Sequence, residues 1–265
     1  MHKDTETTLL EKSLFIHILA DFGETAPETT IYKAILYTRF PNSTIIFTNQ
    51  PFKLGDTIAP GTFLRLIYKD FPPNCIHLCL LHIDSRLPEK YILAKAKGQY
   101  FFAPDNGIVS LAFPGEDVDY FKLQSELPVV DVFKNLYLPA LQKWVEDETN
   151  TGEIETKARR SILVQPTITG NIYRLSVQYN DVHGNAYLNM QQQEFEKIVN
   201  GKKFRFKIGM RETIERISNA YTDVPEGTKL ALFGFGDMLQ IAINCGSAAQ
   251  YLGLNTGQMV MMEVE

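Results

Sequence analysis

The first half of the chain alternates between two patterns of hydrophobic positions. Residues 14–20 form a continuous apolar run, which is typical of a parallel strand buried on both faces. Residues 28–40 have helical spacing instead, and Pro41 ends that pattern. The expected buried face of this helix consists of Ile31, Ile35, Leu36 and Phe40. The same alternation predicts strands at 44–48 and 76–81, helices at 58–68 and 136–145, and a hairpin at 91–102 that turns at Lys97 and Gly98.

Strands that alternate with helices indicate an open, mostly parallel sheet covered by helices. Ligands of such sheets bind beyond the carboxyl ends of the strands. Asp21 directly follows the first predicted strand and is therefore expected at such an end. The pattern predicts an α/β domain at residues 1–160, with its ligand site at that end of the sheet.

The pattern changes after a polar stretch at 146–157, which we interpret as a linker or exposed loop. Beyond it, short apolar segments follow one another closely and are separated by turns that contain glycine. They predict an all-β domain at residues 161–265, built as a small barrel or sandwich. Its expected strands are 167–169, 172–179, 186–190, 204–208, 229–233, 239–244 and 259–263.

Composition sets limits on location and partners. The 265 residues are 45% hydrophobic, enough for two domain cores, and carry a formal net charge of −5. This acidic balance argues against nucleic acid or an anionic membrane as a partner. The basic run 202–207 is interpreted as a solvated strand face. The run 14–20 is too short to span a membrane, so we expect a cytoplasmic protein.

Cysteine and histidine give no sign of a metal site. Cys75, Cys79 and Cys245 form no Cys-x-x-Cys pair, and we expect them to be reduced, buried thiols. The histidines are scattered without zinc-ligand spacing, and His77, on an apolar strand, is expected to be a core residue. The chain also lacks a glycine-rich dinucleotide fingerprint and a phosphate loop. We therefore predict no metal and no bound cofactor.

Polar residues around a glycine turn supply the first functional signal. Asp181 and Asn185 flank Gly184 after a predicted strand, and Asn244 stands in a second polar segment much later in the chain. A carboxylate accepts hydrogen bonds from the two hydroxyls of a ribose, and an amide offers both a donor and an acceptor to a purine edge. These residue types therefore point to a nucleoside site.

Five short motifs carry a resemblance to a known family. They are Asp21-Phe22-Gly23, Lys33-Ala34-Ile35-Leu36, Pro104-Asp105-Asn106-Gly107, Asp181-x-x-Gly184-Asn185 and Gln240-Ile241-Ala242-x-Asn244-x-Gly246-Ser247-Ala248-Ala249. On these motifs the chain resembles the S-adenosylmethionine (SAM) hydroxide adenosyltransferases, a family that includes the fluorinase and the chlorinase. The resemblance covers nearly the whole chain, in the family's order. It implies an α/β domain, a C-terminal β-barrel and a homotrimer whose sites lie between subunits, where SAM or adenosine would be bound as substrate or ligand.

The resemblance also implies roles for individual residues. Asp21 would bind the ribose hydroxyls, Asn185 the adenine edge and Asp181 the methionine end, while adenine would stack on Tyr221. Structural alternatives stay open for three of them. Asp21 could cap the following helix, Asn185 could be an ordinary turn residue, and Tyr221 could be a core tyrosine. The full expected binding set is Asp21, Phe22, Asp181, Asn185, Tyr221 and Asn244.

The catalytic part of the chain departs from the family. Hydrolytic members use an Asp, an Arg and a His to position and activate water for attack on the ribose C5′ carbon. Those three positions fall on His82, Glu89 and Val132. Ala26 stands where the family has an Asp that grips the methionine amino group.

Two function hypotheses therefore stay open. Phe133 falls where halogenating relatives bind halide with a Ser, so a halogenase is not expected. His82, Asp84 and Ser85 could form a substitute catalytic site, or they could lie on a surface loop with no catalytic role. The first hypothesis is a SAM hydrolase that gives adenosine and methionine. The second is an impaired homologue that binds an adenosine-like ligand or serves as a trimeric interaction protein.

Overall fold

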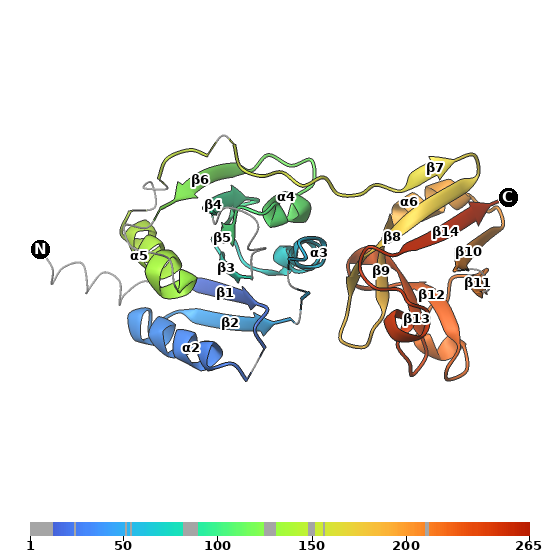
Figure 1. Ribbon diagram of the computed structural model, residues 1–265, viewed down its shortest axis with the longest axis horizontal. Coiled ribbons are helices and arrows are strands. Elements are labelled where there is room, and N and C mark those ends of the chain that lie inside the picture. The colour runs from blue at the N-terminus through green and yellow to red at the C-terminus, as the bar shows by residue number, and fades with distance from the viewer. Residues whose placement is uncertain are drawn as a thin grey trace, which may run out of the picture. The chain divides into compact units, whose positions relative to one another are not determined.

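The chain folds into two compact units (Figure 1). The first consists of Met1–Thr57 and Ile67–Ile162, and the second of Ile58–Leu66 and Leu163–Glu265. The second unit thus takes in most of helix α3 (Ile58–Ile67), which comes from the first half of the sequence. The computed structural model describes residues 13–23, 25–50, 52–53, 55–81, 90–124, 131–147, 152–155, 157–209 and 212–265.

The first unit contains a six-stranded sheet in the order β2-β1-β3-β5-β4-β6. The first four strands of this order are parallel, and β4 is antiparallel to both its neighbours. The expected α/β domain with a mostly parallel sheet is therefore confirmed. Its elements are β1 (Phe15–Ala20), α2 (Pro27–Arg39), β2 (Thr44–Asn49), η1 (Tyr68–Asp70), β3 (Ile76–Leu80), β4 (Tyr91–Ala96), β5 (Gln99–Pro104), α4 (Ile108–Ala112), β6 (Asp119–Leu123), η2 (Phe133–Tyr137) and α5 (Leu138–Glu146).

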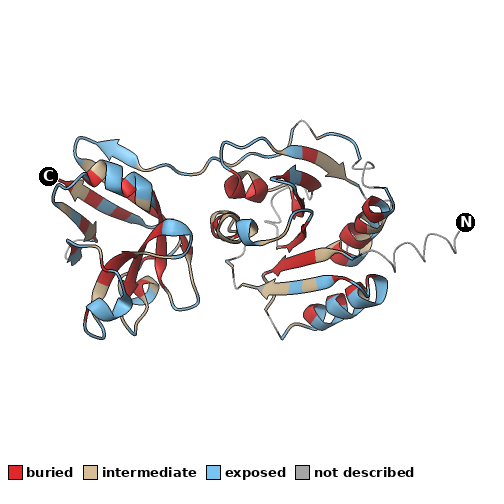
Figure 2. Ribbon diagram, turned by 180° about the vertical axis from the view of Figure 1, so that it is seen from behind, coloured by how far each residue is buried: buried red, intermediate tan, exposed pale blue. Residues whose placement is uncertain are grey.

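Burial explains why the predicted strands and the hairpin form. All residues of β1 after Phe15 are buried, as expected of a strand with neighbours on both sides, and Figure 2 shows it beside the more exposed β2. The hairpin of β4 and β5 turns at the predicted residues. Lys97 and Gly98 both have positive φ, 49° and 74°, which suits a tight turn between twisted antiparallel strands.

Helix α2 forms where expected, but its buried face is only partly the predicted one. Leu36 and Phe40, just beyond the helix, are buried as expected, whereas Ile31 is 42% exposed and Ile35 is only partly buried. Thr29 and Tyr32 are buried in addition. Tyr32 was not predicted to be buried because a tyrosine carries a polar hydroxyl. Its ring packs in the core, and the hydroxyl finds a hydrogen-bond partner there.

A chain of hydrogen bonds crosses the core of the first unit, and we call Thr48, His17, His77 and Gln99 the buried histidine chain. The two histidine Nδ1 atoms lie 2.9 Å apart, His17 Nε2 is 3.1 Å from Thr48 Oγ1, and His77 Nε2 is 3.0 Å from Gln99 Oε1. Both histidines are fully buried, so the expectation that His77 is a core residue is confirmed.

The donor and acceptor roles along the buried histidine chain follow from the contacts of Gln99. Gln99 Nε2 donates to the carbonyl oxygens of Tyr68 and Phe71, each at 3.0 Å, so Gln99 Oε1 must accept from His77 Nε2. His77 Nδ1 is then an acceptor for His17 Nδ1–H, and His17 Nε2 accepts from the Thr48 hydroxyl. Both imidazoles are therefore neutral, each with a defined tautomer.

The second unit is built around a single antiparallel sheet in the order β11-β10-β14-β8-β9-β13-β12, with β7 paired to β8. A further bridge joins Ile217 to Ala231 in β12, so the sheet nearly closes on itself and the expected barrel is confirmed. Its elements are β7 (Thr167–Thr169), β8 (Ile172–Asn180), β9 (Ala186–Gln191), α6 (Gln192–Val199), β10 (Phe204–Ile208), β11 (Glu212–Ile214), η3 (Tyr221–Asp223), β12 (Lys229–Phe233), η4 (Phe235–Asp237), β13 (Met238–Ile243), α7 (Ala248–Tyr251) and β14 (Met259–Val264).

Three features differ from the sequence interpretation. The short elements α4, β6, α6, β11 and α7 were not predicted, because runs of three to eight residues carry little periodicity. Part of the presumed linker pairs with β6, since Lys122 N donates to Glu153 O and Glu155 N to Tyr120 O, each at 2.8 Å. Cys245 is exposed, in contrast to the buried Cys75 and Cys79.

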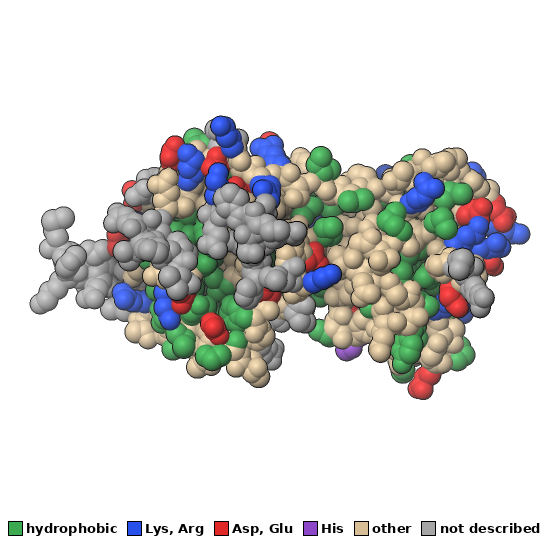
Figure 3. Space-filling model, viewed as in Figure 1, with side chains coloured by type: hydrophobic (Ala, Val, Ile, Leu, Met, Phe, Trp, Pro, Cys, Tyr) green, Lys and Arg blue, Asp and Glu red, His purple; other side chains and the backbone are tan. Residues whose placement is uncertain are grey.

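The basic run 202–207 carries its charge next to carboxylates. Arg205 Nε lies 2.6 Å from Glu215 Oε1, and Lys207 Nζ lies 2.6 Å from Glu263 Oε2. Figure 3 shows side chains of both signs gathered at this end of the second unit. This strand face is therefore a set of exposed ion pairs. No helix in the described part of the chain is long and apolar enough to cross a membrane.

Candidate functional site

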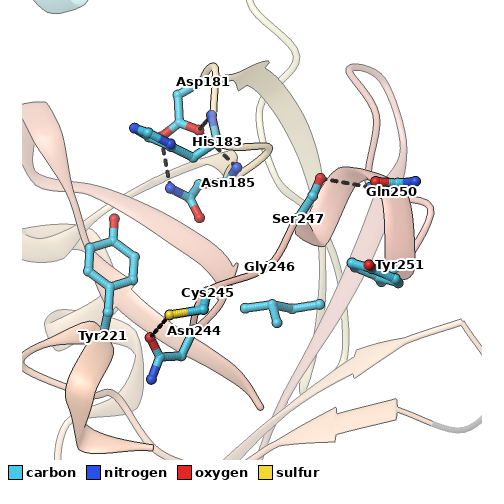
Figure 4. Close-up of a pocket in the computed structure, with 11 residues that line it drawn as sticks. Asp181, His183, Asn185, Tyr221, Asn244, Cys245, Gly246, Ser247, Gln250 and Tyr251 are labelled. Atoms are coloured by element: carbon cyan, nitrogen blue, oxygen red, sulfur yellow. Dashed lines mark hydrogen bonds between the residues drawn. The ribbon is translucent and has the colours of Figure 1, made fainter. Parts of the chain in front are cut away.

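A pocket of about 590 Å³ in the second unit brings together four of the six predicted binding residues (Figure 4). Asp181, Asn185, Tyr221 and Asn244 all line it. They come from the turn between β8 and β9, from η3 and from the end of β13. The remaining lining residues are His183, Ile243, Cys245, Gly246, Ser247, Gln250 and Tyr251.

The turn between β8 and β9 is organised by the Asp181 carboxylate. Its Oδ1 accepts hydrogen bonds from the backbone nitrogens of His183 at 3.0 Å and Asn185 at 2.9 Å. Its Oδ2 accepts from Asn185 Nδ2 at 2.8 Å. Asn185 is thus both a turn residue and a lining residue, because its amide is held at the pocket wall.

Glycine is required at the centre of this turn. Gly184 has φ of 79°, a left-handed conformation that other residues rarely adopt. A Cβ atom at this position would also collide with Ser247 Oγ. Ala249 N donates to Gly184 O at 2.8 Å, which ties the turn to helix α7.

Tyr221 forms the opposite wall of the pocket. Its ring is 39% exposed, which rules out the alternative of a core tyrosine. The hydroxyl donates to Oε1 of the fully buried Gln240 at 2.9 Å, and this bond fixes the ring across the pocket. Partial burial raises the pKa of Tyr221, so the hydroxyl stays protonated as a donor at neutral pH.

Asn244 and Ser247 shape the floor of the pocket. Asn244 Nδ2 donates to Val224 O at 2.8 Å, and the next residue, Cys245, has φ of 57°. Ser247 Oγ accepts from Gln250 N at 3.2 Å and caps the short helix α7. These bonds turn the chain sharply after β13 and bring Gly246 and Ser247 to the pocket surface.

The other two predicted binding residues, Asp21 and Phe22, lie in the first unit directly after β1. Helix α2 begins at Pro27, and its N-cap residue is Ala26. Asp21 is therefore not the cap of this helix. Phe22 packs against Tyr32 and Phe47, with ring centroids 6.1 and 6.2 Å away.

A pocket of about 480 Å³ in the first unit is lined by Phe22 together with Val132 and Phe133. Phe133 is fully buried and stacks on Tyr32 with ring centroids 4.2 Å apart. The Tyr32 hydroxyl donates to Asp131 Oδ1 at 3.0 Å, and burial together with this bond raises the pKa of Tyr32. The position expected to hold the family's catalytic imidazole is therefore apolar, since Val132 cannot accept a proton, while Glu28, Asp131 and Lys134 line the same pocket.

The sequence indicated the turn residues but not every lining group. Gln250 and Tyr251 were not predicted, and Ser247 appeared only as part of a family motif, although a serine directly before a short helix is a recognisable capping signal. The contact of Tyr32 with Asp131 joins positions 99 residues apart and leaves no local signal. The candidate substitute residues His82, Asp84 and Ser85, and also Glu89, lie outside the described residues.

No group of three His, Cys, Asp or Glu side chains in the described part of the chain is close enough to hold a metal ion.

Comparison with known proteins identifies two domains in the chain. Residues 16–137 match the model of the SAM hydroxide adenosyltransferase N-terminal domain, and residues 175–261 match that of the C-terminal domain. The chain is 23% identical over 272 residues to the (R)-S-adenosyl-L-methionine hydrolase of Thermus thermophilus, covering 93% of this chain and 98% of that protein.

Two crystal structures share the fold. A conserved uncharacterized protein from Thermotoga maritima has a TM-score of 0.82 and 21% identity, covering 94% of this chain and 99% of its own. A conserved hypothetical protein from Thermus thermophilus has a TM-score of 0.73 and 20% identity, covering 95% and 100%. The arrangement of an α/β unit followed by a barrel thus recurs along nearly the full length of all three chains.

Proposed function

This chain belongs to the SAM hydroxide adenosyltransferase family, and we propose that it binds SAM by the adenosine group and hydrolyses it to adenosine and methionine. In this reaction water attacks the ribose C5′ carbon. A C5′–O bond forms, the C5′–S bond breaks, and the sulfur of methionine keeps the electron pair while water gives up a proton. The observation that carries the proposal is the convergence of Asp181, Asn185, Tyr221 and Asn244 on one pocket.

The pocket suits a nucleoside in size and chemistry. Small-molecule sites usually enclose about 300–1,000 Å³, and this one encloses about 590 Å³. The exposed face of Tyr221 offers a surface on which a purine can stack, and the Asn185 amide can pair with its edge. We assign Asp21 to the ribose hydroxyls, in sites that lie between subunits of a homotrimer.

The hydrolytic step is expected to be slow. General acid–base groups typically accelerate a reaction by about two to four orders of magnitude, and the first-unit pocket presents Val132 where the family's histidine is expected. This observation favours a second candidate function, the binding of an adenosine-like ligand without turnover. His82, Asp84 and Ser85 are the residues that could supply substitute chemistry.

Turnover distinguishes the two candidates. The purified protein is incubated with SAM, and adenosine and methionine are quantified against the Thermus thermophilus hydrolase. We expect equal amounts of the two products, formed at least about a hundredfold more slowly than by the relative. Release of adenosine that disappears in His82→Ala or Asp84→Ala would assign the chemistry to that segment. If the protein binds adenosine but forms no product, the binding function stands and hydrolysis is excluded.

A further inference from the structure

The Asn185 amide has only one orientation that its surroundings allow. Nδ2 lies 2.8 Å from Asp181 Oδ2, and a carboxylate accepts hydrogen bonds but donates none. The nitrogen must therefore face Asp181, which leaves the amide oxygen on the other side. Figure 4 shows this oxygen turned away from Asp181 toward the open centre of the pocket. No group within the described ranges donates a hydrogen bond to it.

The Asp181 carboxylate is itself held in place. Its other oxygen accepts from the backbone nitrogens of His183 and Asn185, so it cannot rotate without breaking two hydrogen bonds. From the far side, Asn180 Nδ2 donates to Asn185 O at 3.4 Å and to Leu254 O at 2.8 Å. The turn is thus fixed before any ligand enters, and Asn185 meets the ligand as a rigid group.

An amide in this orientation presents a defined pattern to a ligand. One of its two N–H hydrogens is given to Asp181, so an oxygen acceptor and one hydrogen remain for the pocket. Asn pairs in this way with the 6-amino group and N7 of adenine. A 6-oxopurine such as hypoxanthine places two acceptors there instead, and its oxygen would face the amide oxygen.

We propose that Asp181 is a positioning residue that makes this pocket selective for 6-aminopurine nucleosides over 6-oxopurine nucleosides. The proposal rests on the proposed nucleoside-binding function. To accept a 6-oxopurine, the Asn185 amide would have to flip and turn its oxygen toward the carboxylate, which offers no donor. Asp181 therefore disfavours a 6-oxopurine by fixing the Asn185 amide, without contacting the base itself. A carboxylate has about four lone-pair sites, and Asp181 uses three of them in these hydrogen bonds. The remaining site leaves Asp181 able to contact another part of the ligand as well.

The test measures adenosine and inosine binding by calorimetry, in the full-length protein and in three variants. Asp181→Asn keeps the shape and the acceptor for the backbone nitrogens but adds an N–H donor, so Asn185 can flip. Asn185→Ala removes the selecting amide and leaves the Asp181 bonds to the backbone. Asp119→Asn makes the same change of charge at an exposed residue of β6 and serves as the matched control. Thermal melting establishes that each variant is folded.

The unmodified protein and Asp119→Asn should bind adenosine at least about tenfold more tightly than inosine. In Asp181→Asn the ratio should fall to within about threefold, mainly because inosine binds better. Asn185→Ala should bind both nucleosides weakly and without preference. Unchanged selectivity in Asp181→Asn, or none in the unmodified protein, would overturn the inference while nucleoside binding stands. Absence of adenosine binding to the unmodified protein would overturn both.

Discussion

Acidification should destabilise the first unit through its buried histidine chain. His17 and His77 are neutral in the fold. Protonating His77 would place two N–H groups face to face between Nδ1 atoms that lie 2.9 Å apart, and protonating His17 would turn its Nε2, which accepts from the Thr48 hydroxyl, into a donor. Burial lowers the pKa of His17 to about 3 and that of His77 to about 4. A charge on His77 lowers the pKa of His17 further, while the hydrogen bond from His77 to Gln99 opposes the lowering of the pKa of His77.

The sign and size of the effect follow from these values. An unfolded chain protonates its histidines below about pH 6.5, whereas the fold excludes those protons until the pH reaches about 4. The stabilising effect is therefore complete above pH 6.5 and is lost as the pH falls. Each histidine contributes a slope of about 1.4 kcal/mol per pH unit, so the pair should cost about 4 kcal/mol between pH 7 and pH 5. Domains are stable by about 5–15 kcal/mol, so this loss is large.

A single substitution should halve the dependence of the free energy of unfolding on pH. In His77→Gln the side-chain oxygen can accept from His17 and the side-chain nitrogen can donate to Gln99 Oε1, so the hydrogen bonds keep their direction with one titrating group fewer. The loss of free energy of unfolding between pH 7 and pH 5 should fall from about 4 to about 2 kcal/mol. His183→Gln, at an exposed position, is the control and should leave the pH dependence unchanged.

Trp144 provides the assay. It is the single tryptophan of the chain, and it is buried in the first unit with its ring 4.6 Å from Tyr100. Its fluorescence during urea unfolding at pH 7, 6 and 5 reports on the unit that holds the histidines. A free energy of unfolding that is constant across this range, or an equal slope in His77→Gln, would refute the argument that both imidazoles are buried neutral.

Three further predictions concern the pocket and the assembly. Gly184→Ala should cost about 2 kcal/mol of stability in urea unfolding, because the methyl group meets Ser247, whereas Gly253→Ala, also at positive φ but in open space, should cost about 1 kcal/mol. Asp21→Ala should weaken adenosine binding by about 1.5–3 kcal/mol in calorimetry, the value of a hydrogen bond to a charged group. Sedimentation should give a trimer, and a monomer at all concentrations would contradict sites shared between subunits.

The sequence was most informative where the deciding interactions are local. Residues 14–20 predicted a buried central strand because burial on both faces demands an unbroken apolar run. Lys97 and Gly98 predicted the hairpin turn because tight turns require positive φ. In the second unit, Asp181, Gly184 and Asn185 could be identified because their hydrogen bonds span four residues and repeat a known turn chemistry.

The sequence was least informative where distant segments meet. The buried face of α2 was predicted to include Ile31, which is exposed, and not Tyr32, which is buried because Asp131 satisfies its hydroxyl from 99 positions away. The hydrogen bond from Tyr221 to Gln240 was likewise invisible, although it decides how the ring stands in the pocket. No periodicity records such pairs, since each depends on how strands and helices pack in three dimensions.

The same difference between local and distant contacts separates the two pockets of this chain. The turn that carries Asp181 and Asn185 is held by hydrogen bonds within four residues, and the bond from Asn244 to Val224 O also lies within the second unit. The apolar wall of the first-unit pocket depends on Phe133, which is fully buried and stacked on Tyr32. Replacing Val132 by histidine would introduce a base, yet its neighbour Asp131 already accepts the Tyr32 hydroxyl and pairs with Lys134 at 3.3 Å. Because Asp131 is engaged in these contacts, we expect Val132→His alone to supply an imidazole that Asp131 does not orient.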